Sequence, residues 1–167
     1  SAWTQSPVAF WPLDELVGND FFDTSGNNLD GTAHGTVIVP GIKGNCRSFN
    51  GSGDYLEVPD NDLLDITGEI TIMFWAKTNV HSSSFIPISK RVFDGDINYA
   101  MAFGIVREPG GSLASGLAFQ YNFRPSVQYG TYFEYHDNQW HHYALALQFG
   151  NPGSAKWIID GIPREGW

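Results

Sequence analysis

The fold is decided by the segment Glu69-Ile70-Thr71-Ile72-Met73-Phe74-Trp75-Ala76-Lys77. Its side chains alternate with the two-residue period of a strand, so that Ile70, Ile72 and Phe74 share one face and Thr71, Met73 and Trp75 share the other. Both faces are largely apolar, and β-branched and aromatic residues favour strands. A strand that is apolar on both faces is typical of the inside of a sandwich, so we expect a central strand here and not an edge strand.

Strand patterns recur on both sides of this segment. Residues 8–14 and the β-branched residues 32–39 predict two earlier strands. Residues 46–49 and 55–58 flank Asn50-Gly51-Ser52-Gly53-Asp54, which is a strong hairpin signal. Later strands are expected over residues 85–89, 99–106, 117–123, 127–135, 140–149 and 156–160. Because no window keeps a 3.6-residue apolar period over three turns, the pattern predicts an all-β fold, a two-sheet antiparallel jelly-roll sandwich.

Length and charge exclude several classes of protein. A chain of 167 residues fits one domain. The net charge is -9, from 9 basic and 18 acidic residues, and there is no basic run. A chain this acidic repels phosphate backbones, so we do not expect a nucleic-acid partner. No stretch approaches the roughly 20 apolar residues of a membrane span, so none is expected.

The polar turn over residues 23–31 contains the best candidate metal ligands. Asp23, Asn27 and Asp30 supply oxygen atoms on a turn that contains two glycines, which is the donor set that Ca²⁺ prefers. Asp14 is a further candidate ligand if the end of its strand lies beside this loop. The alternative is an Asx-rich turn, in which the same side chains hydrogen-bond the loop's own backbone. A zinc site is not expected, since adjacent His141 and His142 point to opposite faces of a strand.

Tyrosines on two consecutive expected strands provide a candidate carbohydrate-binding surface, because the CH faces of sugar rings stack on aromatic rings. The candidates are Tyr121, Tyr129 and Tyr132. The alternative is that these rings pack between the two sheets.

An enzyme is not expected. Glycosidases on a sandwich of this type need two or three acidic residues at alternating positions of a central strand. The expected central strands carry Thr71, Met73 and Trp75, or Gln120 and Asn122, where those acids would lie. Neither a nucleophile elbow nor a phosphate loop is present.

Several blocks, in this order, resemble laminin-G-like domains of the concanavalin A-like superfamily. They are Val8-Ala9-Phe10-Trp11-Pro12-Leu13-Asp14, Asp23-Thr24-Ser25-Gly26-Asn27-Asn28, Phe49 to Pro59, Glu69 to Lys77, Asn138 to Leu145 and Ile159-Asp160-Gly161. The resemblance implies a two-sheet jelly roll shared with legume lectins and pentraxins. It also implies a non-catalytic module that binds glycans or proteins, with structural or functional calcium, and buried positions for Trp11, Trp75 and Trp140.

The chain departs from this resemblance at its end, because the family continues past Asp160-Gly161 with about two more strands. We therefore expect residues 1–167 to form a single laminin-G-like β-sandwich domain that lacks its last strands. Either the sequence is a fragment of a longer chain or another subunit completes the sheet, and a missing strand would leave an open sheet edge. The first hypothesis is carbohydrate binding, assisted by calcium, in an extracellular or surface-exposed setting. The alternatives are a structural or protein-interaction domain of a larger extracellular or virion-surface assembly, with another chain at the open edge, and a glycoside hydrolase.

Overall fold

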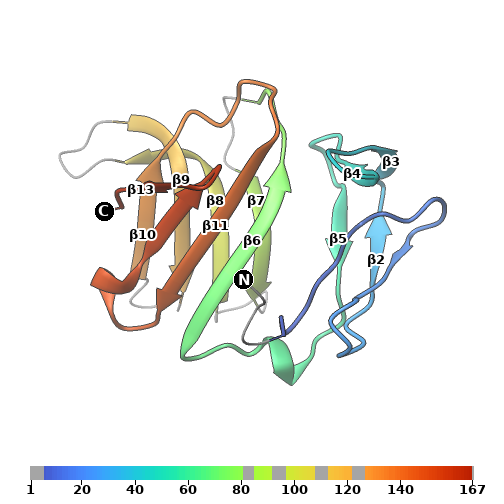
Figure 1. Ribbon diagram of the computed structural model, residues 1–167, viewed down its shortest axis with the longest axis horizontal. Coiled ribbons are helices and arrows are strands. Elements are labelled where there is room, and N and C mark those ends of the chain that lie inside the picture. The colour runs from blue at the N-terminus through green and yellow to red at the C-terminus, as the bar shows by residue number, and fades with distance from the viewer. Residues whose placement is uncertain (1–5, 81–84, 92–96, 108–112, 122–126, 167) are drawn as a thin grey trace. The chain divides into compact units, whose positions relative to one another are not determined.

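A computed structural model describes residues 6–80, 85–91, 97–107, 113–121 and 127–166, and these residues are almost all β (Figure 1). They form two compact units, Ser1–Asp65 and Ile66–Trp167, called here the N-terminal and C-terminal units. Antiparallel strands dominate each of them, as the alternation patterns predict. A single domain over residues 1–167 stays a prediction.

The C-terminal unit is a sandwich of two four-stranded antiparallel sheets (Figure 1). The first has the order β13-β12-β11-β6 and the second the order β10-β9-β8-β7. Their bounds are β6 (Glu69–Ala76), β7 (Phe85–Arg91), β8 (Ile97–Arg107), β9 (Leu113–Tyr121), β10 (Val127–Tyr132), β11 (His141–Gln148), β12 (Lys156–Ile159) and β13 (Ile162–Arg164). A 3₁₀ turn, η2 (Pro152–Ser154), joins β11 to β12.

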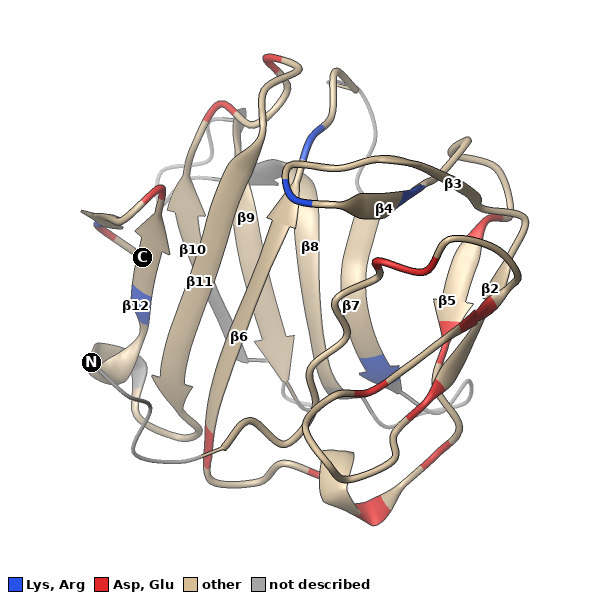
Figure 2. Cartoon of the chain, turned by 45° about the vertical axis from the view of Figure 1, so that its right-hand side comes forward, with Lys and Arg blue, Asp and Glu red and all other residues tan. Residues whose placement is uncertain are grey.

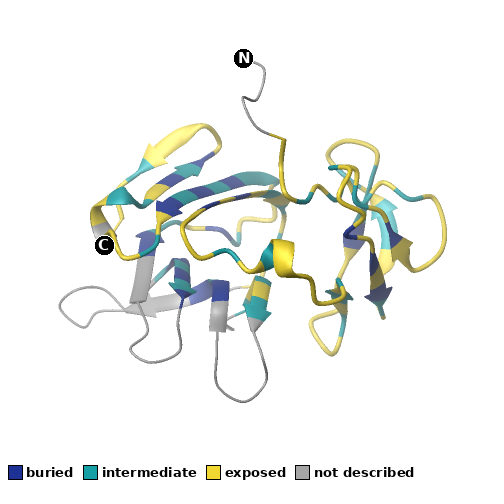
Figure 3. Cartoon of the chain, turned by 90° about the horizontal axis from the view of Figure 1, so that it is seen from below, coloured by how far each residue is buried: buried dark blue, intermediate teal, exposed yellow. Residues whose placement is uncertain are grey.

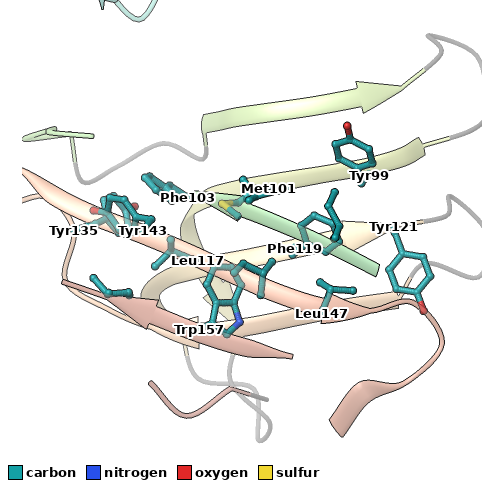
Figure 4. Close-up of a cluster of buried hydrophobic side chains, with 14 residues drawn as sticks. Tyr99, Met101, Phe103, Leu117, Phe119, Tyr121, Tyr135, Tyr143, Leu147 and Trp157 are labelled. Carbon is teal, nitrogen blue, oxygen red and sulfur yellow. The ribbon is translucent and has the colours of Figure 1, made fainter. Parts of the chain in front are cut away.

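The core of this unit lies between the two sheets, where every second side chain points inward (Figure 4). Phe103 on β8 is fully buried and lies against Tyr143 of the facing sheet, with ring centroids 4.8 Å apart. The inward residues with almost no exposed surface are Met101, Phe103, Leu117, Phe119, Tyr135, Tyr143, Leu145, Trp157 and Ile159. Burial of this many large apolar side chains is the main source of the unit's stability.

Strand β6 departs from the expectation of a central strand, because it is an end strand of its sheet among the described residues. Its inner face is buried at Ile70 and Ile72, but Met73 and Trp75 on the outer face are 43% and 49% exposed. The expectation that Trp75 is buried is therefore wrong for this structure. Trp11 and Trp140 are half-buried.

Residues 6–65 of the N-terminal unit contain two small antiparallel sheets and one 3₁₀ turn. Its strands are β1 (Asp20–Phe21), β2 (Gly31–His34), β3 (Val37–Pro40), β4 (Asn45–Ser48) and β5 (Tyr55–Glu57), and the turn is η1 (Asp62–Leu64). The first sheet has the order β1-β2-β5, and the second pairs β3 with β4. On β2, Gly31 and Ala33 are buried and Thr32 between them is exposed, and on β1 Phe21 is buried next to the exposed Asp20. Figure 3 shows such buried and exposed bands on the strands.

Three local expectations for this unit are corrected by the structure. Residues 8–14 do not form a strand; Leu13 has a φ of 58°, which is incompatible with an extended chain. The expected strand over residues 32–39 is divided at Gly35, whose φ is 75°, and a Cβ there would collide with Asp54. The turn after Phe49 exists but joins no hairpin, since β4 pairs with β3 and β5 pairs with β2.

Candidate functional site

The carboxylate of Asp23 organises the first polar turn. Its Oδ1 accepts hydrogen bonds from the backbone N–H groups of Phe10, at 2.9 Å, and Ser25, at 2.8 Å. Its Oδ2 accepts from the Ser25 hydroxyl, at 2.7 Å, and from the backbone N–H of Leu29, at 3.1 Å. Partial burial acts to raise the pKa of Asp23, but these hydrogen bonds outweigh it and lower the pKa to about 2.

The other predicted calcium ligands also bind the chain itself. Asp30 Oδ1 accepts from the backbone N–H of Asp23, at 2.8 Å, and Asp14 Oδ1 accepts from that of Asn45, at 2.6 Å. The side-chain amide of Asn27 donates to the carbonyl of Val8, at 2.8 Å. Asp23, Asn27 and Asp30 thus stabilise the turn and the segment before it, in line with the Asx-turn alternative, whereas Asp14 binds the start of β4.

In this arrangement the turn does not fit a calcium ion. A carboxylate has about four acceptor positions, and four donors already occupy those of Asp23. A cation at the same oxygens would lie against the N–H donors and would require the loop to rearrange. Within the described ranges, no group of three or more His, Cys, Asp or Glu side chains is placed to hold a metal ion.

The three predicted carbohydrate-binding tyrosines do not form one surface. Tyr121 lies in the core, 5% exposed, where its ring stacks on Phe149 at 4.5 Å and its hydroxyl accepts from the backbone N–H of Gly150 at 2.6 Å. The packing alternative therefore describes Tyr121. Tyr132 is half-buried and pairs with Gly116, so it faces away from the core-facing residues of β9. The side chain of Tyr129 lies outside the described residues.

A polar face that combines an aromatic ring with hydrogen-bonding groups lies on the sheet β1-β2-β5. We call it the Tyr55 face; its residues are Asp20, Thr32, His34, Tyr55 and Glu57. The ladder places His34 opposite Tyr55, and Thr32 opposite both Glu57 and Asp20. Tyr55 is 50% exposed. Figure 2 marks Asp and Glu positions on β5 and in the loops of this unit in red.

Contacts within the Tyr55 face hold its aromatic ring in place. The rings of His34 and Tyr55 stack with centroids 4.4 Å apart. His34 Nε2 lies 3.1 Å from Glu57 Oε2, and the Thr32 hydroxyl donates to Asp20 Oδ1 at 3.3 Å. The sequence-based predictions did not include this face, although the alternation of Tyr55 and Glu57 around the inward Leu56 was a signal for it.

A second polar cluster surrounds His141 at the start of β11. His141 Nδ1 lies 2.7 Å from Asp160 Oδ2, and its Nε2 lies 3.1 Å from Asp137 Oδ1. Asp160 also accepts from the backbone N–H of His142 at 2.8 Å. Desolvation acts to lower the pKa of His141, but its bonds to the two carboxylates outweigh this and raise the pKa. This arrangement, called here the His141 clamp, joins the loop before β11 to the turn after β12.

The His141 clamp makes stability depend on pH. A histidine whose pKa is raised on folding stabilises fully below its unfolded value of 6.5 and loses that contribution as pH rises through the folded value. The lowered pKa values of Asp137 and Asp160 act in the opposite range: their contribution is present above 3.8 and is lost as pH falls. We therefore expect the clamp to stabilise most between these two values, and urea unfolding at about pH 5 and about pH 8 measures the difference.

The matched control for the clamp is His141→Gln, which is neutral at both pH values. The variant should lose less stability than the wild type between about pH 5 and about pH 8, because the remaining histidines titrate equally in both proteins. Equal losses in the two proteins would contradict the role of His141.

Comparison with known proteins identifies a family for this chain. A family model described as concanavalin A-like lectin/glucanases superfamily matches residues 50–166, which is more than half of the chain and includes Tyr55 and Glu57. No curated protein and no solved structure matches the chain. Among the residues that the structure describes, no helix has the length and apolar character needed to cross a membrane.

Proposed function

The chain belongs to the concanavalin A-like lectin/glucanases superfamily, and from this premise we propose that it is a non-catalytic recognition module that binds carbohydrate. The superfamily supports a carbohydrate- or protein-binding module in general. The finer assignment to carbohydrate rests on the Tyr55 face, because fold alone does not determine function.

The observation that carries the proposal is the half-exposed ring of Tyr55, which is stacked on His34 and flanked by polar groups. An aromatic ring offers an apolar platform to the CH face of a sugar. The carboxylates of Glu57 and Asp20 and the hydroxyl of Thr32 can hydrogen-bond sugar hydroxyls around it. Because internal contacts already hold the ring, binding would cost little side-chain entropy.

The outer face of β6 supports a non-catalytic role. Thr71, Met73 and Trp75 occupy the positions where a sandwich glycosidase would carry its acids, and none of these side chains can act as a general acid or a nucleophilic carboxylate. Gln120 on β9 likewise carries an amide, which cannot act as a general acid or a nucleophilic carboxylate.

A glycan array, read once with calcium and once with a chelator, tests the proposal. We expect retention of at least one class of glycan or polysaccharide. Absence of binding to a broad array under both conditions would contradict carbohydrate recognition.

Replacing Tyr55 with alanine should weaken binding to an array hit by about tenfold, since loss of one stacking partner removes roughly 1.4 kcal/mol of binding energy. Titration calorimetry measures the change. The matched control is Phe49→Ala, which removes another aromatic ring of the same unit, 51% exposed, outside the Tyr55 face. Equal affinities of wild type and Tyr55→Ala would show that the glycan binds outside the Tyr55 face.

Calcium assistance stays a prediction from the resemblance, and nothing in the proposed function depends on it. Thermal melts with calcium and with a chelator distinguish the alternatives, because a ligand of the native state raises Tm. A rise that Asp23→Ala abolishes would place the ion in the first polar turn. Equal Tm values with calcium and with a chelator would indicate that the carboxylates of the turn act only as hydrogen-bond acceptors. An extracellular or surface-exposed location is part of the same proposal.

A further inference from the structure

Nearly all of the chain's net charge belongs to the N-terminal unit. Residues 1–65 contain ten Asp or Glu and two Lys or Arg, a formal charge of -8, whereas residues 66–167 contain eight and seven, a formal charge of -1. A surface field of one sign attracts ligands of the opposite sign and repels ligands of the same sign. The Tyr55 face belongs to the strongly charged part of the chain, so the charge of its ligand matters for binding.

Two carboxylates lie beside the aromatic ring on this face. Asp20, Thr32 and Glu57 form one row across β1, β2 and β5, because Thr32 is opposite both of the others. Neighbouring strands are about 4.8 Å apart, so the carboxylates stand on either side of Thr32. Tyr55 precedes Glu57 by two residues on β5 and shares its face, at a distance of about 7 Å along the strand. A sugar ring on Tyr55 would therefore be within reach of Glu57.

Internal contacts fix the two carboxylates and engage one oxygen of each. His34 Nε2 lies 3.1 Å from Oε2 of Glu57, and the Thr32 hydroxyl donates to Oδ1 of Asp20 at 3.3 Å. The second oxygen of each group, Oε1 of Glu57 or Oδ2 of Asp20, can accept a hydrogen bond from a ligand. The side chain of Glu57 is 60% exposed. A donor on a bound sugar would thus meet a carboxylate that is already oriented.

The two Lys and Arg residues of this unit lie outside the Tyr55 face. Arg47 is buried, where its Nη1 donates to the carbonyl of Gly18 at 3.0 Å and its Nη2 lies 3.8 Å from Glu15 Oε2. Lys43 lies in the turn that joins β3 to β4, the second sheet of the unit. Of the five residues that define the face, His34 alone is basic, so the two ionised carboxylates leave the face negative whether His34 is neutral or protonated.

We propose that the Tyr55 face selects glycans that carry free amino groups and rejects acidic glycans. This inference rests on the proposed function and names its ligand class. The sugar ring would stack on Tyr55, and a protonated amino group beside it would donate to Glu57 or Asp20 in a charge-assisted hydrogen bond. An N-acetyl group keeps an N–H donor but loses the charge. Uronic acids and sulfated sugars would bring a like charge to the carboxylates, which disfavours binding.

Titration calorimetry at low salt and about pH 6, where carboxylates are ionised and sugar amines are protonated, tests the ligand class. The probes are a β-linked glucosamine oligomer, its fully N-acetylated counterpart of the same length, and a uronic acid oligomer. We expect the glucosamine oligomer to bind about fivefold more tightly than the acetylated one, which is the upper end of the usual effect of one exposed ion pair. The uronic acid oligomer should bind most weakly.

The ratio of the first two affinities measures the contribution of the carboxylates. Glu57→Gln keeps the shape of the side chain and removes its charge, and it should lower the ratio to below about twofold. The matched control is Asp62→Asn, which removes one charge from the same unit outside the Tyr55 face and should keep the ratio of the wild type. Tyr55→Ala should weaken both oligomers by the same factor.

The outcomes separate this inference from the proposed function. Equal affinities of the two oligomers, tighter binding of the uronic acid oligomer, or an unchanged ratio in Glu57→Gln would overturn the amino-sugar preference. Failure of the glucosamine oligomer to bind, while another glycan binds in a Tyr55-dependent manner, would also overturn it and would leave carbohydrate recognition supported. Absence of binding by every probe and by the glycan array would contradict both.

Discussion

Replacing Phe103 with alanine should lower the free energy of unfolding by about 3–5 kcal/mol, the usual cost of truncating a buried phenylalanine. The ring has no exposed surface and lies within 6 Å of four other rings. These rings come from both sheets and from the segment after β10: Phe74, Phe85, Tyr135 and Tyr143. Truncation would therefore leave a cavity at the centre of the sandwich that its neighbours can only partly fill.

Urea unfolding followed by circular dichroism measures this cost. The matched control is Trp75→Ala on the outer face of β6. Although tryptophan is larger, its 49% exposure predicts a smaller loss, about 1–2 kcal/mol. A Trp75→Ala cost equal to that of Phe103→Ala would contradict the exposure of the outer face of β6.

Replacing Asp23 with alanine should cost about 3 kcal/mol, because hydrogen bonds to a charged group are worth roughly 1.5–3 kcal/mol and the donor of the buried Leu29 is left unpaired. Leu29, whose backbone N–H would lose its acceptor, is 3% exposed. The backbone N–H groups of Phe10 and Ser25 lose the same carboxylate. The surface variant Asp62→Ala is the control and should change stability by less than about 0.5 kcal/mol.

Hydrogen exchange localises the effect of Asp23, since the amides of Phe10, Ser25 and Leu29 should lose protection together. The pH dependence follows from the lowered pKa. The stability contributed by Asp23 is present above pH 3.8 and is lost as the pH falls toward about 2. Over this range, the free energy of unfolding of Asp23→Ala should therefore fall less than that of the wild type. Unchanged protection of the three amides would contradict the hydrogen-bonded turn.

Alternation along the strands was enough to predict the β-sandwich. Phe103, Leu117 and Phe119 are inward residues of strands that were expected from the sequence, and all three are fully buried. The predictions that were wrong concern the pairing of strands that are distant in the sequence. The turn after Phe49 resembles a hairpin turn locally, but β5 pairs with β2. Strand pairing depends on tertiary contacts throughout the unit and not on the turn sequence alone.

The candidate site was harder to predict, for the same physical reason. Alternation assigns a tyrosine to one of two faces but does not say which face is covered. Both a surface and a core position were therefore open for Tyr121, which lies in the core, and Tyr55, which is half exposed, was not singled out. The oxygen-rich turn at Asp23 was recognised, but donor types alone cannot separate a metal site from a hydrogen-bonded turn.

Amide chemical-shift mapping with an array-positive glycan tests carbohydrate recognition at the Tyr55 face most directly. We predict that the largest shifts fall on His34, Tyr55 and Glu57, and that in Tyr55→Ala the shifts of His34 and Glu57 require about tenfold more glycan. Shifts confined to residues 66–166, or no shifts at glycan concentrations well above Kd, would contradict the assignment.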